Sequence, residues 1–102
     1  MAITNGYLTT NVAPIYTSVG NTAVTTAYFC NLDSSARTFT LFIVPSGSSG
    51  GANNCVYSGV QVASQDTYVI DMEKIILGNG DFIAANCSAN TAIVATISYI
   101  GI

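Results

Sequence analysis

Hydrophobic and polar residues alternate along most of this chain with the two-residue period of a β-strand. The clearest example is residues 93–100, where one face carries Ile93, Ala95, Ile97 and Tyr99. Residues 82–87 alternate in the same way, and a short polar joint, residues 88–90, separates the two runs. The pattern predicts two strands that pair as a β-hairpin in the middle of a sheet.

The rest of the chain predicts further short strands and no long helix. Alternating or β-branched stretches cover residues 22–31, 37–44, 55–64 and 67–72. Residues 74–77 fit either one helical turn or a short strand. Short strands at intervals of about ten residues are typical of two packed sheets. We therefore expect an all-β fold, a single antiparallel β-sandwich or jelly-roll-like domain of about seven to eight strands.

Two segments depart from this pattern. Residues 1–21 contain no charged side chain and only a short apolar piece after Pro14. They predict an N-terminal arm or edge strand that leads into the sandwich of residues 22–102. Residues 45–54, PSGSSGGANN, predict an exposed, mobile loop without a core residue. That loop is either a spacer between strands or a tip that contacts a partner.

The scarcity of charge bears on the surface of the protein. Half of the 102 residues are hydrophobic and only 7% are charged, against roughly a quarter in ordinary soluble proteins. Because charge is the usual means of solvating a small domain, other protein chains are expected to cover part of the surface. A neutral Ser/Thr surface that is simply soluble is the alternative.

The few charges also exclude two classes of partner. With only two basic residues, the chain cannot neutralise enough phosphates to bind nucleic acid, nor can it form a polybasic membrane anchor. Residues 82–102 are uncharged, but polar residues interrupt them throughout, so we expect no membrane span.

Few residues have the chemistry of a catalytic or metal site. The chain has no His, which is the usual general acid or base at neutral pH, so we expect neither an enzyme nor a cofactor. Calcium takes oxygen ligands from loops. The weak candidates for such a site are Asp71, Glu73, Asn79 and Asp81. The simpler interpretation is that these residues stabilise turns.

The odd number of cysteines argues against a disulfide framework. The N-terminal residues lack the pattern of a signal peptide, so we expect Cys30, Cys55 and Cys87 to be reduced thiols. One oxidised pair is the alternative. Cys30 and Cys87 lie within alternating apolar strands and are expected to be buried, whereas Cys55 borders the Gly-rich loop and should be the most accessible.

Three segments together resemble the small all-β virion proteins of tailed bacteriophages. They are the charge-poor opening MAITNGYLTTNVAPIYTS, the stretch ILGNGDFIAANCSAN and the closing strand TAIVATISYIGI. The resemblance extends over the whole chain. It implies a structural subunit without catalytic residues, found in the virion after assembly in the host cytoplasm. Such a subunit is either a capsid decoration (cement) protein or a component of the tail, baseplate or fibre, including a receptor- or carbohydrate-binding module.

A decoration protein is the favoured interpretation, because a compact domain with an uncharged arm suits many repeated, neutral contacts. We expect it to bind the major capsid protein or another virion protein, and to form a homo-oligomer, with a trimer favoured. The contacts are expected in the N-terminal arm and in the loop of residues 45–54. The candidate interface residues are Ile3, Tyr7, Leu8, Ile15, Tyr16, Ser46, Ser48, Asn53 and Asn54.

Overall fold

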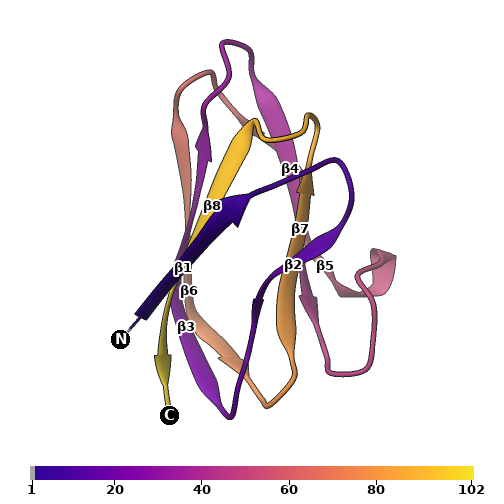
Figure 1. Ribbon diagram of the computed structural model, residues 1–102, viewed down its shortest axis with the longest axis vertical. Helices are drawn as coiled ribbons and strands as arrows, with labels where there is room; N and C mark the ends of the chain where they lie inside the picture. Colours follow the sequence, from indigo (N-terminus) through magenta and orange to yellow (C-terminus); the bar gives the residue numbers. More distant parts are fainter. Residues whose placement is uncertain (1) are drawn as a thin grey trace.

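Two antiparallel sheets of four strands each pack face to face, which confirms the predicted β-sandwich (Figure 1). The computed structural model describes residues 2–102, apart from the side chains of Glu73 and Lys74. The strand order of the first sheet is β1 (Ala2–Tyr7), β8 (Ile93–Gly101), β3 (Thr22–Asn31) and β6 (Thr67–Leu77). The order of the second sheet is β2 (Ala13–Thr17), β7 (Phe82–Cys87), β4 (Arg37–Val44) and β5 (Cys55–Val62). Residues 74–77, which fitted a helical turn or a strand, continue β6.

The strand pairings are nested. The first strand pairs with the eighth, the second with the seventh, the third with the sixth and the fourth with the fifth. Only the link from β4 to β5 joins two strands of the same sheet, and the other connections cross between the sheets. The described chain is therefore arranged like one long hairpin, bent between β4 and β5 and wrapped into two layers.

The expected hairpin between residues 82–87 and 93–100 is wrong. Both segments are strands and both lie inside a sheet, but β7 pairs with β2 and β4, whereas β8 pairs with β1 and β3. Residues 88–92 form a corner between the two sheets, where Thr91 adopts a positive φ of 59°. Alternation predicts which residues share a face of a strand, but it carries no information about which strand lies alongside.

The core lies between the two sheets and is centred on a pair of aromatic rings. Phe29 of β3 and Phe39 of β4 stack with ring centroids 4.1 Å apart and an interplanar angle of 8°. Other fully buried members of the same cluster are Leu8, Val24, Leu41, Leu77, Ile83, Ile93 and Ile97. Burying each large apolar side chain contributes about 1.5–3 kcal/mol, so this interface is the main source of stability.

The N-terminal residues form edge strands, one in each sheet. β1 pairs with β8 from Ala2 to Tyr7, and β2 pairs with β7. Leu8, between these strands, is only 2% exposed, and its backbone N–H donates a hydrogen bond to the carbonyl of Ile93. Of the two expectations for this segment, the structure has the edge strand.

The Gly/Ser-rich loop packs against a second, smaller apolar cluster. Phe42, Val44 and Ala84 are buried on the side of the second sheet that faces away from the core. The loop turns back beside β4 and ends in a single 3₁₀ turn, η1 (Ala52–Asn54), at the right of Figure 1. A Cβ atom on Gly50 would lie 2.8 Å from a methyl carbon of Val12 and 3.7 Å from the ring of Phe42. The loop therefore shields an apolar patch, although none of its own residues is buried.

Candidate functional site

The candidate interface residues of the N-terminal segment divide into two groups. Ile3 and Tyr7 project outward from β1 and are well exposed, at 66% and 62%. Leu8 belongs to the core, and Ile15 and Tyr16 pack against it. The ring of Tyr16 lies 4.3 Å from that of Tyr99, and its hydroxyl group is hydrogen-bonded to the hydroxyl of Thr22 at 3.1 Å. Leu8 is therefore used for folding, which corrects its assignment as a partner contact. Ile15 and Tyr16 are partly buried against the core, and their assignment as partner contacts stays a prediction.

The candidate residues of the loop remain at the surface. Ser46, Ser48 and Asn53 are exposed. The side chain of Asn54 is held within the loop, because its Nδ2 donates to the carbonyl of Ser49 at 2.9 Å and its Oδ1 accepts from the N–H of Gly51 at 3.0 Å. Asn54 therefore stabilises the turn that places the loop against β4.

The weak calcium candidates do not form one cluster in the part of the chain that the structure describes. Asp71 is exposed on β6, opposite Thr26 of β3, whereas Asn79 and Asp81 lie in the turn between β6 and β7. The side chain of Glu73 lies outside the described residues. No group of three or more His, Cys, Asp or Glu among the described side chains is suited to hold a metal ion.

Asn79 and Asp81 are occupied by turn contacts. Oδ1 of Asn79 accepts a hydrogen bond from the backbone N–H of Gly20 at 2.9 Å. The two carboxylate oxygens of Asp81 accept from the N–H groups of Ser46 and Gly78, both at 2.8 Å. These bonds, that from Ser46 first, hold the pKa of Asp81 below its usual value of 3.8. The turn thus joins three loops at one end of the sandwich.

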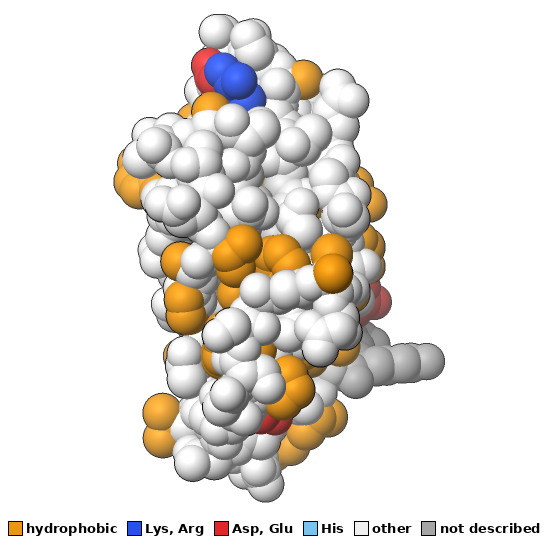
Figure 2. All heavy atoms as spheres, turned by 90° about the vertical axis from the view of Figure 1, so that its right-hand side faces the viewer, with side chains coloured by type: hydrophobic (Ala, Val, Ile, Leu, Met, Phe, Trp, Pro, Cys, Tyr) orange, Lys and Arg blue, Asp and Glu red, His pale blue; other side chains and the backbone are white. Residues whose placement is uncertain are grey.

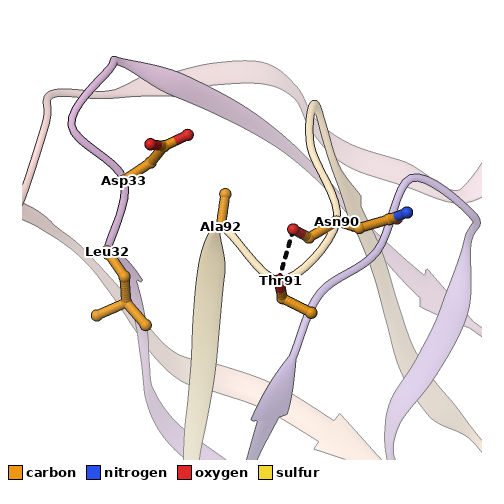
Figure 3. A pocket seen from close by; sticks show the side chains of 5 residues that line it. All are labelled: Leu32, Asp33, Asn90, Thr91 and Ala92. Carbon is orange, nitrogen blue, oxygen red and sulfur yellow. Dashed lines mark hydrogen bonds between the residues drawn. The ribbon is translucent and has the colours of Figure 1, made fainter.

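A pocket of about 310 Å³ opens at the end of the sandwich where β3 and β8 meet their loops. It is lined by Leu32, Asp33, Asn90, Thr91 and Ala92 (Figure 3). In this view the carboxylate of Asp33 lies above the methyl group of Ala92, and the side-chain amide of Asn90 points away from it. The hydroxyl of Thr91 donates to the carbonyl of Asn90 at 2.7 Å.

Asp33 is the one charged group among the described residues that line this pocket. Arg37 donates to the Asp33 carboxylate at 2.6 Å, and this bond, with a further one from the N–H of Ser34, lowers the pKa of Asp33. Asp33 is therefore a carboxylate at neutral pH, which suits it to accept hydrogen bonds from hydroxyl groups. It has no His beside it to serve as a base, since the chain contains none.

One buried side chain fixes the loop that carries Asp33. Asn31 is fully buried, and its Nδ2 donates to the carbonyls of Ser35 and Val62 at 3.0 and 3.1 Å. Its Oδ1 accepts from the N–H of Asp33 at 2.9 Å. Nothing in the sequence pattern singles out this residue, because one polar residue at the end of an apolar strand also fits a turn.

The outer face of the first sheet, the side turned away from the core, contains none of the predicted site residues apart from Ile3, Tyr7 and Asp71 among the described side chains. The strand register gives its rows of neighbouring side chains. One row is Tyr7, Val94, Cys30 and Thr67. The next is Asn5, Thr96, Tyr28 and Val69, and the third is Ile3, Ser98, Thr26 and Asp71. Beyond them lie Ile100, Ala23 and Ile76.

The strand register and the burial of each cysteine test the predictions made for them from the sequence. All three are free thiols. Cys87 is buried, as predicted, with its thiol donating to the carbonyl of Ala89. The prediction for Cys30 is wrong, because it lies on the outer face of the first sheet and is partly exposed. Cys30 and Cys55 are both partly exposed, so their exposure does not make Cys55 the most accessible of the three cysteines.

Comparison with the models of known protein families, with curated proteins and with solved structures gives no match. No helix in the described part of the chain is long and apolar enough to cross a membrane.

Proposed function

We propose that this protein is a non-enzymatic structural protein of a bacteriophage virion, namely a capsid decoration protein that attaches to the outer shell as an oligomer. The observation that carries the proposal is the exposure of large apolar side chains on a charge-poor sandwich. Tyr7, Tyr28 and Val69 are exposed together on one sheet face. Surfaces of this kind mark sites of protein–protein contact.

The arrangement of the strands supports the same proposal. Eight strands with nested pairings, divided between two four-stranded sheets, are what a jelly roll requires, and viral capsid domains use that fold. Fold alone does not define function. The proposal therefore rests on the surface together with the resemblance of the sequence to small virion proteins, and the strand order adds support.

The copy number of the chain in its particle tests this function. Quantitative mass spectrometry of purified virions should find hundreds of copies of the chain, and immunogold labelling should place them over the head. A few copies confined to the tail would transfer the chain to a tail, baseplate or fibre role. If the chain is absent from purified particles, both the decoration role and the tail, baseplate or fibre role are overturned.

The pocket beside Asp33 favours a second candidate, a carbohydrate-binding module of a tail or fibre. A carboxylate fixed by Arg37, with the exposed side chain of Leu32 lining the same pocket, can accept hydrogen bonds from sugar hydroxyls while an apolar sugar face packs against Leu32. A glycan array probed with the wild-type chain and with Asp33→Asn tests it. Binding that the substitution weakens supports this candidate, and a blank array with the wild type rejects it.

A further inference from the structure

We propose that the outer face of the first sheet binds a second copy of this chain, so that two sandwiches stack face to face about a two-fold axis. This inference assigns to contact between copies of the chain the same sheet face that supports the virion function, and it proposes a dimer in place of the trimer favoured from the sequence. The purified chain alone can test it.

A loop of the chain packs against one outer face of the sandwich, whereas large apolar side chains of the other outer face remain exposed. On the second sheet, the loop of residues 45–54 lies against Phe42, and the apolar cluster there is buried. What remains visible on that side is mostly backbone and uncharged polar side chains, with a row of hydrophobic side chains across the middle and others scattered around it (Figure 2). On the first sheet, large side chains including Tyr28 and Val69 remain exposed in the single chain, at 41% and 55%.

Several exposed apolar side chains of the first sheet stand opposite one another on neighbouring strands. Tyr28 on the inner strand β3 stands directly opposite Val69 on β6, and Tyr7 on the edge strand β1 stands opposite Val94 on β8. Tyrosine at the centre of a flat surface supplies a large contact area and loses little conformational entropy on binding, which is why it recurs at interface hot spots. The face therefore has the composition of an interface centre.

The size of the face is sufficient for a specific dimer. Strands lie about 4.8 Å apart and rise about 3.4 Å per residue, so four strands of this length present roughly 600 Å² on each copy. Two such faces would bury roughly 1,200 Å² in total, which exceeds the approximately 1,000 Å² that a specific interface needs. An area at this lower end is typical of weak or transient complexes.

The charge among the described side chains of this face permits the pairing. Among the described side chains of the face, Asp71 carries the only charge, and it lies on the edge strand β6, where it stays in contact with solvent. A two-fold axis parallel to the strands lays β6 of one copy over β1 of the other. Each Asp71 then faces the edge that carries Ile3, so the two like charges do not meet.

Sedimentation velocity on the wild type and on Tyr28→Lys tests the proposal. The wild type should convert from monomer to dimer between the low micromolar and the hundred-micromolar range. Tyr28→Lys places two cations in the middle of the stacked faces and should raise the dissociation constant by about 30-fold or more. The matched control is Val56→Lys, which adds the same charge at a 50% exposed position on the second sheet and should dimerise like the wild type.

A wild type that stays monomeric throughout this range, or that forms a trimer, overturns the proposal. So does a Tyr28→Lys variant that associates as strongly as Val56→Lys. Thermal melting at dilute concentration shows whether Tyr28→Lys is folded, and Val69→Lys replaces it if it is not.

A second measurement needs no substitution. Cys30 lies on the proposed interface, whereas Cys55 lies on the second sheet, and both thiols are partly exposed in the single chain. As protein concentration rises, thiol labelling of Cys30 should slow several-fold while labelling of Cys55 keeps its rate. Equal rates for both thiols at every concentration contradict the stacking.

Discussion

The carboxylate of Asp81 accepts a hydrogen bond from the backbone N–H of Ser46 at 2.8 Å, across 35 positions of sequence. Its other oxygen accepts from Gly78, and its backbone carbonyl accepts from the N–H of Ser18. One residue therefore ties the turn between β6 and β7 to the ends of β2 and β4. It also fixes the start of the loop that lies against Phe42.

Acid should weaken the hydrogen bonds that the Asp81 carboxylate accepts from Ser46 and Gly78. The pKa of Asp81 in the folded protein lies below 3.8, its usual value. Folding thus favours the carboxylate, whose stabilising contribution is fully present above that value and is lost as the pH falls below it. We expect Asp81→Asn to lower the urea midpoint at neutral pH, because the amide replaces one acceptor oxygen by a donor. The gap between the two proteins should narrow below pH 3.8, and a gap that stays constant down to the acid limit would contradict this account.

A side chain at Gly80 should destabilise the same turn. Gly80 has a φ of 85°, and a Cβ atom built there would lie 2.6 Å from the hydroxyl oxygen of Ser46. We expect Gly80→Ala to cost about 1–2 kcal/mol of unfolding free energy from the left-handed backbone alone. Gly6→Ala is the matched control, because a Cβ there meets no atom within 4 Å. Similar losses from both substitutions in urea titrations would refute this explanation.

The buried amide of Asn31 should matter more than its position at a strand end implies. Asn31→Ala leaves the carbonyl groups of Ser35 and Val62 without their side-chain donor. Leaving a buried polar group unpaired costs about 1–3 kcal/mol. We expect a loss of this size in chemical denaturation, whereas Asn5→Ala, at an exposed position of β1, should change stability by less than about 0.5 kcal/mol. Near-equal stability of the two variants would mean that water replaces the amide.

The strands were predictable from sequence because two-residue alternation reports burial one residue at a time. Residues 22–31 and 37–44 become β3 and β4 with their predicted bounds. The partners of each strand were not predictable in this way. The corner at Thr91 separates β7 from β8, and a short polar joint looks the same whether it turns a hairpin or crosses between sheets.

The candidate surface was predictable only in part, for a related reason. Alternation showed that Cys30 and Val94 belong to apolar strands, but one face of each strand had to be assigned to the core. Cys30 was assigned inward, whereas the register places it outward beside Val94. The sequence also does not predict that the loop shields the apolar patch at Phe42. Gly50 packs closely against Val12 and Phe42 because it has no side chain, and no sequence pattern reports such a contact.

Removal of the N-terminal residues gives the sharpest test of how the molecule is built. Deleting residues 1–12 takes away β1, which pairs with β8 along its whole length, and also Leu8. An interior leucine alone is worth about 2–5 kcal/mol, against a total stability of about 5–15 kcal/mol for a small domain. A detachable arm would leave a folded domain, but this segment belongs to the sandwich. We therefore expect the truncated chain to be unfolded or insoluble.

Two point variants separate the loss of core packing from the loss of chain length. Leu8→Ala should lower the unfolding free energy by about 2–5 kcal/mol, because it leaves a cavity in the core between the two sheets. Ile3→Ala removes a side chain of similar size from the same segment, but one that points to solvent, and should cost less than about 1 kcal/mol. Urea denaturation of both variants below the concentration of self-association gives the comparison. If Leu8→Ala is as stable as Ile3→Ala and the truncated chain folds, the N-terminal segment is an arm and the core is complete without it.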